Sequence, residues 1–298
     1  MIVEAFSPAK INLFLHVTGK RSDGFHELYT LMTSLAFGDL LEFDFTGSGV
    51  TVICDHPDVP EDDSNLVYRA IVLFIDRYFK VEPLGKKKIG VCTTIYKKIP
   101  VGAGLGGGSS NAATALQVLN RQFGHPFSKQ ELMDMGLTLG ADVPFFIHGG
   151  PAFARGVGEV LFPCPPLAPY HVVVCFPGFS VRTSLVYENV NFALTKKKKT
   201  NNNALLNMSG TKQSLDVKGL LHNDLEPAAL KIYPDIIRAR EMMAGFEPDG
   251  LLMAGSGSSY FALFSEVSKA NEAFKGLCRE TKADQGRLFL TSFFKDNV

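Results

Sequence analysis

A glycine-rich stretch at residues 100–111, PVGAGLGGGSSN, stands directly ahead of a run with helical spacing. Glycine is about 1 kcal/mol worse than alanine inside a helix, so these glycines must serve something other than helix formation. The start of a helix offers unpaired N–H groups and about half a positive charge, and glycine lets the backbone approach a phosphate closely. The stretch therefore predicts a phosphate-binding loop. The alternative is a flexible turn capped by Ser109.

The familiar phosphate-binding loops do not fit this stretch. A Walker A loop needs a lysine after its glycines, and none follows here. A dinucleotide fingerprint needs an acidic residue about twenty positions further on, but Asn120 stands there and the next acidic residue is Glu131. The glycine loop of protein kinases is accompanied by HRD and DFG motifs, which the sequence lacks. What remains is a strand, a glycine loop with two serines, and a helix N-terminus.

Phosphoryl transfer also needs groups that neutralise charge and that orient or deprotonate the acceptor hydroxyl. The chain offers Asp142, just past a predicted helix end in GADVPFF, and Lys10, which strand alternation places beside Asn12 on a polar face. Each has a plainer explanation. Asp142 fits a helix N-cap with Pro144 in the following turn, and Lys10 fits a solvent-exposed strand lysine. The residues alone leave both explanations open.

The elements that must position these groups alternate between strand and helix patterns. Alternating hydrophobicity predicts a strand at 11–17, and helical spacing after a Ser64 cap predicts a helix at 64–79. Mixed hairpins and crossovers favour an α+β fold, and a proline-rich break at 163–169 favours two domains, 1–157 and 158–298. The other predicted elements are strands at 39–45, 88–99, 170–176 and 286–293, a strand, glycine turn and strand at 250–266, and helices at 112–123, 128–140, 226–245 (interrupted at Pro234) and 268–279.

Composition excludes several classes of protein. The 298 residues carry 30 basic and 30 acidic side chains, so no basic face for nucleic acid is expected. The 5 cysteines include no CxxC pair, which favours a reducing compartment. No secretory signal and no run of about 20 apolar residues is visible, so we expect a cytoplasmic protein without membrane contact, a monomer or weak homodimer. The Lys- and Asn-rich segment 195–214 is expected to be a mobile surface segment.

The glycine loop resembles the phosphate loop of the GHMP small-molecule kinases, a family that includes galactokinase, homoserine kinase and mevalonate kinase. Further stretches extend the resemblance over nearly the whole chain and narrow it to members that phosphorylate a cytidine diphosphate-linked methylerythritol. One small departure is Ser258, where the family more often has Pro, Ala or Gly. The stretches are SPAKINLFLHVTGKRSDGFHEL (7–28), SNLVYRA (64–70), LGADVPFFI (139–147), HNDLEP (222–227) and GSGSSYFALF (255–264).

This resemblance implies a two-domain fold, with an N-terminal nucleotide-binding domain, a C-terminal substrate domain and the active site in the cleft between them. It implies ATP-dependent phosphorylation of the substrate's 2-hydroxyl, with Mg²⁺ as the accompanying ion, on the route to isoprenoid precursors. Asp142 is then the base on that hydroxyl, and Lys10 lies between the carboxylate and the γ-phosphate. The ATP-binding residues that it implies are Asn65, Lys97, Pro100, Val101, Gly102, Ala103, Gly104, Leu105, Gly106, Gly107, Gly108, Ser109 and Ser110.

Recognition of the cytosine is expected in the segment GFHEL, at residues 24–28. By resemblance, Phe25 stacks on the base, His26 meets its polar edge, and Tyr187 supplies a second ring with Thr183 nearby. Asn12 is expected to contact the same substrate. For Phe25 and Tyr187 the alternative is ordinary core packing.

The adenine side is less defined by the sequence. Asn65 and the Lys97–Lys98 pair are candidates, with solvent-exposed lysines as the alternative. No metal ligand is assigned by the sequence.

Two other functions are compatible with such a loop. One is a kinase for another small alcohol, such as homoserine, which has no reason to keep GFHEL. The other is a non-catalytic binder of nucleotides or sugar phosphates, which is expected to lack Lys10 or Asp142. The sequence has both residues and the GFHEL segment.

Overall fold

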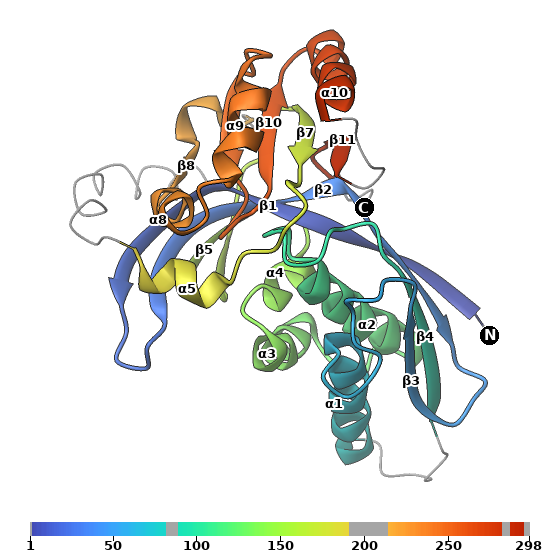
Figure 1. Cartoon of the computed structure of the whole chain (residues 1–298). Helices are drawn as coiled ribbons and strands as arrows, with labels where there is room; N and C mark the ends of the chain where they lie inside the picture. The colour runs from blue at the N-terminus through green and yellow to red at the C-terminus, as the bar shows by residue number, and fades with distance from the viewer. Residues whose placement is uncertain (1, 82–88, 191–213, 282–286, 295–298) are drawn as a thin grey trace. The chain divides into compact units, whose positions relative to one another are not determined.

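The computed structural model describes residues 2–81, 89–190, 214–281 and 287–294 (Figure 1). Contacts between residues divide the chain into two compact units, each assembled from several stretches. Unit 1 contains residues 1–9, 38–101 and 106–149, and unit 2 contains residues 10–37, 102–105 and 150–298. The sequence-based division at residue 157 cuts the chain only once, and as a division into functional domains it stays a prediction.

Among its described residues, unit 1 combines part of a sheet with four helices. Strand β3 (Gly49–Cys54) runs parallel to β4 (Gly90–Tyr96), and β4 pairs antiparallel with the last part of β2 (His26–Asp44). Helices α1 (Leu66–Val81), α2 (Gly107–Gln122), α3 (Lys129–Leu139) and α4 (Val143–His148) pack against one another. Almost every residue from Ser110 to Asn120 is buried, so the helix that follows the glycine loop is the centre of this core.

The limits of these helices follow local sequence signals. Ser128 and Glu131 form the predicted capping box at the start of α3, and Gly140 ends that helix. Gly124 has φ 78° just past α2, a left-handed conformation that glycine adopts without strain. These predicted helix ends are confirmed.

The described residues of unit 2 contribute to two sheets. In the first, β1 (Ile2–Lys20) lies between β2 and the short β8 (His222–Asn223), while β5 (Ala152–Gly156) joins β2 to β6 (Val160–Pro163). The second has the order β11-β7-β10-β9, formed by Leu288–Ser292, His171–Cys175, Tyr260–Phe264 and Gly250–Met253.

Helices cover the second sheet of unit 2. Helices α9 (Ile236–Ala244) and α10 (Val267–Thr281) pack on it, as the orange and red part of Figure 1 shows. Helix α8 (Glu226–Ile232) ends just before Pro234, as predicted, and α5 (Thr183–Glu188) packs against α8. A short 3₁₀ helix spans Lys218–Leu220.

The mixed α+β class is confirmed, and most predicted elements lie within a few residues of their expected limits. The strands at 11–17 and 39–45 were predicted too short, because β1 and β2 each continue for 19 residues and are divided between the units. The segment 195–214 lies outside the described residues except for its last position. None of the described helices is long and apolar enough to cross a membrane.

Candidate functional site

The glycine loop ends at the first turn of α2. Gly106 is the N-cap, with φ 73° in the left-handed region and no side-chain cap. The cap expected at Ser109 in the flexible-turn alternative is absent, because Ser109 lies inside the first turn. The first intrahelical bond of this turn runs from Ser110 N–H to the Gly106 carbonyl at 2.9 Å. The N–H groups ahead of it have no acceptor within the helix, which makes this end a place for an anion.

A buried polar network anchors that helix end from below. Asp39 is fully buried and forms an ion pair with Lys97, with 2.5 Å between Oδ2 and Nζ. Asn111 donates to the same Asp39 oxygen and to Ser7 Oγ, both at 2.9 Å. Ser7 Oγ in turn donates to Ser110 Oγ at 2.8 Å. The side chain of Ser110 is therefore used inside the protein.

Lys97 lies under the start of α2 rather than in solvent. Its side chain is 5% exposed, and a Cβ built on Gly107 would lie 3.1 Å from its Nζ. The alternative of a solvated lysine is wrong for Lys97, while its neighbour Lys98 is exposed. The ammonium thus places a positive charge beside the first residue of the helix.

Asn65 is placed beside the loop as the cap of α1. Its Oδ1 accepts from Val67 N–H at 2.8 Å, and its Nδ2 donates to the Pro60 carbonyl. The next residue, Leu66, has its Cδ1 3.4 Å from a Cβ built on Gly108. The starts of α1 and α2 therefore lie together, and a contact of Asn65 with adenine stays a prediction.

Asp142 stands at the N-cap position of α4, with Pro144 in the first turn. The plainer explanation is right about the position, but the carboxylate makes no capping hydrogen bond. The preceding turn lies against the glycine loop, since a Cβ built on Gly140 would be 3.6 Å from Ser109 Oγ. Unit 1 thus brings the carboxylate-bearing turn to the first turn of α2.

Lys10 is held by a chain of hydrogen bonds in unit 2. Its Nζ donates to Asn12 Oδ1 at 2.8 Å, and Asn12 Nδ2 donates to Thr30 Oγ1 at 2.9 Å. Thr30 donates onward to the Phe14 carbonyl at 2.5 Å. Lys10 is 5% exposed and Asn12 3%. The alternative of a solvent-exposed strand lysine is therefore wrong.

The first part of the glycine loop packs closely on the turn between β9 and β10. Gly104 has φ 78°, and a Cβ there would lie 2.2 Å from the Ala254 carbonyl oxygen. Ser259 N–H donates to the Ala103 carbonyl at 3.2 Å. On the same turn, a Cβ built on Gly255 would be 3.5 Å from Lys10 Nζ. Glycines 104 and 255 are thus required by close backbone packing beside Lys10.

Two of the three rings expected at the base, those of His26 and Tyr187, are in contact. Phe25 is 61% exposed, so core packing does not explain it. His26 is buried at the start of β2, and its ring lies 5.2 Å from that of Tyr187, with 30° between the planes. Burial, followed by the charge of Lys20, lowers the pKa of His26 below its ordinary value. Thr183 begins α5, the helix that also carries Tyr187, and its Oγ1 lies 2.9 Å from Ser256 Oγ.

The structure also shows polar residues that the sequence analysis missed. Asp39, Asn111 and Ser7 anchor the loop, and Thr30 orients the Lys10–Asn12 pair. None belongs to a motif with fixed spacing, because each acts through partners far away in sequence. The sequence therefore carries no local signal of this network, and its buried charge shows only in the structure.

Two family models match the chain. They are described as the GHMP kinases N terminal domain, over residues 65–150, and the GHMP kinases C terminal, over residues 192–283. Together they cover more than half of the sequence.

Named relatives match over most of their length. A 4-diphosphocytidyl-2-C-methyl-D-erythritol kinase of Syntrophus aciditrophicus is 40% identical over 91% of this chain and 93% of its own. The protein of the same name from Syntrophotalea carbinolica is 40% identical over 92% and 94%.

Solved structures agree with these matches. A crystal structure of 4-(cytidine 5'-diphospho)-2C-methyl-D-erythritol kinase is similar with a TM-score of 0.76 and 34% identity, covering 98% of this chain and all of its own. Homoserine kinase from Cytophaga hutchinsonii, at 18% identity and a TM-score of 0.71, covers 98% and 93% and shares the fold.

Proposed function

The chain belongs to the GHMP kinases, and from that premise we propose that it transfers the γ-phosphoryl group of ATP to the 2-hydroxyl of 4-diphosphocytidyl-2-C-methyl-D-erythritol. Relatives at 35–40% identity over about nine-tenths of the chain carry that substrate in their names. The reaction is a step towards isoprenoid precursors, and its products are ADP and the phosphorylated alcohol.

We assign the catalytic roles to a carboxylate and an ammonium. Asp142 accepts the proton of the 2-hydroxyl as its oxygen bonds to phosphorus and the bond to the ADP oxygen breaks. Lys10 stabilises the negative charge that is shared among the phosphoryl oxygens. The N–H groups at the start of α2, with Lys97 beneath them, bind phosphate oxygens. The support for this is that Lys10 is buried and oriented by Asn12, and that the turn leading into Asp142 lies against Ser109 of the glycine loop.

The single observation that carries the choice of substrate is the contact of His26 with Tyr187, directly after the exposed Phe25 in the chain. The exposed ring of Phe25 provides a stacking face, and the buried imidazole of His26 provides a polar edge. A pyrimidine base has a face that can stack on the first and an edge that can hydrogen-bond to the second. A kinase for homoserine has no base to bind. We therefore favour the cytidine substrate over another small alcohol. We also favour a kinase over a non-catalytic binder, because Asn12 holds the ammonium of Lys10 in a fixed position in which it can stabilise phosphoryl charge.

Mg²⁺ fits as the ion that accompanies ATP. Mg²⁺ prefers oxygen ligands, most of which come from phosphates and water in kinases. Of the loop serines, Ser110 is fully buried and bonded to Ser7, whereas Ser109 is half-buried beside Gly140. Ser109 is thus the hydroxyl that would join its ligands, and the ion neutralises charge on the phosphates when bound.

The remaining parts of the proposal concern the adenine side of the site, the cellular compartment and the oligomeric state. Asn65 borders the nucleotide side, at the joined starts of α1 and α2. All five cysteines are free thiols, which is compatible with the reducing cytoplasm. We propose that the protein works there as a monomer or weak homodimer on small-molecule substrates.

One assay tests this function directly. Release of ADP is measured with Mg²⁺ and ATP in the presence of 4-diphosphocytidyl-2-C-methyl-D-erythritol, homoserine or no acceptor. Turnover with the cytidine substrate at least 10²-fold above the other two is expected. Comparable rates with homoserine would contradict the substrate, and ATP binding without turnover of either would contradict the kinase.

A further inference from the structure

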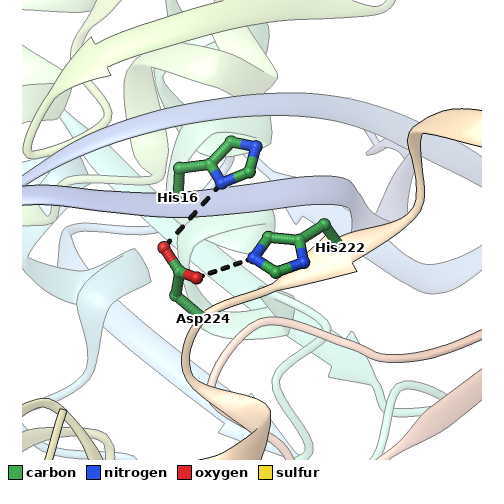
Figure 2. Close-up of side chains that lie close together, drawn as sticks. All are labelled: His16, His222 and Asp224. Atoms are coloured by element: carbon green, nitrogen blue, oxygen red, sulfur yellow. Dashed lines mark hydrogen bonds and ion pairs between the residues drawn. The ribbon is translucent and has the colours of Figure 1, made fainter. Parts of the chain in front are cut away.

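Two histidines and an aspartate meet on one face of the first sheet in unit 2, outside the residues assigned to phosphoryl transfer (Figure 2). In the parallel pair of β1 and β8, Phe14 lies opposite His222 and Leu15 opposite Asn223. Because side chains alternate along a strand, His16 lies on the same face as Phe14 and His222. Continuing the register by two residues brings Asp224 opposite His16. The strand pairing itself therefore assembles the three side chains.

The carboxylate of Asp224 contacts one nitrogen of each imidazole. Its Oδ1 is 2.6 Å from His222 Nε2, and its Oδ2 is 3.8 Å from His16 Nδ1. The two rings face each other, with 4.6 Å between centroids and 24° between planes. One nitrogen of each ring and one carboxylate oxygen all lie within 4.8 Å of one another. Figure 2 shows both rings directed at the carboxylate.

The backbone fixes the carboxylate in this position. Val17 N–H donates to Asp224 Oδ2 at 2.8 Å, and Asp224 N–H donates to the Leu15 carbonyl at 2.9 Å. Next to it, Asn223 donates to the carbonyls of Met253 and Gly255. Asp224 is thus held at both its main chain and its side chain, and little freedom has to be lost when a ligand binds.

The cluster is shielded but still reached by solvent. Side-chain exposure is 8% for Asp224, 18% for His16 and 28% for His222. Burial opposes the charge of Asp224, but the hydrogen bonds from His16, His222 and Val17 outweigh it and hold its pKa well below the usual range.

We propose that His16, His222 and Asp224 bind one divalent transition-metal ion, with Zn²⁺ as the best match. Two imidazole nitrogens and one carboxylate oxygen are a common set of three protein ligands for zinc, with water in the fourth position. In a tetrahedral site with bonds of about 2.1 Å, neighbouring ligand atoms are about 3.4 Å apart. One nitrogen of each ring and one oxygen of Asp224 lie within 4.8 Å of one another, so side-chain rotations that bring these three atoms to about 3.4 Å complete the site.

The chemistry also separates this ion from the one that accompanies ATP. Imidazole suits zinc, cobalt and nickel, whereas Mg²⁺ favours oxygen ligands. Binding converts the contact of His222 with Asp224 into two bonds to the metal, and any proton held there goes to solvent. The bound ion cross-links β1 and β8 through their histidines, and it has no part in phosphoryl transfer.

Calorimetric titration of tag-free, chelator-treated protein with Zn²⁺ tests the site, in millimolar Mg²⁺ and without nucleotide. One equivalent is expected to bind, and His16→Ala and His222→Ala are each expected to weaken it by at least about 10²-fold. The matched control is His171→Ala, which removes a half-buried histidine from strand β7 of the same unit and should leave binding unchanged. Circular dichroism establishes that each variant is folded.

Two results would overturn the site. Absence of one-equivalent binding by the unmutated protein is the first, and binding that survives both histidine substitutions, as expected for cysteine ligands, is the second. Titration with Co²⁺ adds a spectroscopic readout, because a tetrahedral site of nitrogen and oxygen ligands gives visible absorption that His171→Ala retains and His222→Ala loses. Since no turnover is measured, failure of the metal site and failure of the kinase proposal are distinguishable.

Discussion

The imidazole of His26 lies 5.2 Å from the phenol ring of Tyr187, with 30° between their planes. The distance is within the range of interacting aromatic pairs. His26 comes from the start of β2 and Tyr187 from α5, and both belong to unit 2. The contact holds the buried imidazole in place, and the exposed side chain of Phe25 precedes it in the chain, so this segment offers a fixed polar edge and an exposed stacking face.

This arrangement predicts discrimination between cytidine and uridine substrates. A site that hydrogen-bonds the N3 and amino edge of cytosine leaves its own groups unpaired when uracil presents a donor there. We expect kcat/KM to differ by at least about 10²-fold, measured with the two diphospho-nucleoside substrates. His26→Ala should remove most of this ratio. Phe25→Ala should weaken both substrates equally, because stacking does not depend on the identity of the base.

A control for that experiment is Tyr96→Ala, which removes an exposed aromatic side chain from β4 in unit 1 and should leave both substrates unaffected. Equal kcat/KM for the two nucleosides in the unmutated protein would show that the base is not recognised by its edge. If Phe25→Ala loses the discrimination and His26→Ala keeps it, the assignment of edge recognition to His26 is wrong.

The pH dependence of base recognition follows from the pKa of His26. Burial and the charge of Lys20 lower it, so the folded protein favours the neutral imidazole above and somewhat below pH 6.5. The stabilisation that this gives is present above the unfolded-state value and is lost as the pH falls through the lowered one. The cytidine-to-uridine ratio should be constant from pH 8 to about 6.5 and fall only below that. A ratio that changes near pH 7.5 would contradict it.

Much of the loop could be predicted from the sequence because its signals are local. The glycines before α2, the capping box of Ser128 and Glu131, and the glycine that ends α3 each depend on residues within a few positions. The strand alternation that placed Lys10 beside Asn12 is also local, and their hydrogen bond confirms the shared face. Such local patterns predict which face of a helix or strand carries a side chain, and the folded structure has the same face.

What the sequence could not predict depends on distant partners. The sequence leaves open whether Lys97 is an ATP contact or a solvent-exposed lysine, and its ion pair with Asp39 places it beneath α2. The sequence predicts equally well that Tyr187 packs in the core or contacts the substrate. The structure adds that its ring contacts His26 at the start of β2. In both cases the deciding neighbour lies far away along the chain, and the free energy comes from pairing buried polar groups rather than from local propensity.

Replacing Asp142 by asparagine tests the proposed base. The change keeps the size and removes the group that accepts the proton, so turnover should fall about 10²–10⁴-fold. ATP binding, measured by calorimetry, should be retained, because the start of α2 is untouched. Turnover within tenfold of the unmutated protein would show that Asp142 has a structural role.

Thr30 is expected to act on catalysis by positioning Lys10. Its hydroxyl accepts from Asn12, whose amide oxygen accepts from Lys10 Nζ. Thr30→Val keeps the shape and breaks this chain, so kcat should fall about tenfold with KM nearly unchanged, less than the loss in Lys10→Ala. Thr30→Ser restores the hydroxyl and should restore kcat. A fall in thermal stability without a change in kcat would mean that the chain serves folding only.

Asp39 is predicted to stabilise unit 1 more than any exposed ion pair does. It is fully buried and accepts from Lys97, from Asn111 and from the N–H groups of Lys98 and Ile99. Asp39→Asn leaves the Lys97 ammonium buried without its counter-charge, which should lower the free energy of unfolding by about 3–5 kcal/mol.

The matched comparison for Asp39 is the exposed pair of Lys218 and Asp249, 2.8 Å apart, in which the lysine side chain is 56% exposed. Asp249→Asn should cost about 1 kcal/mol or less, because solvent screens such a pair. Urea denaturation of both variants gives the two values. The double variant Asp39→Asn/Lys97→Met removes the buried charge as well and should recover part of the loss. If the two single variants are equally stable, or the double variant is the weakest, the ion pair beneath α2 is not what holds the glycine loop in place.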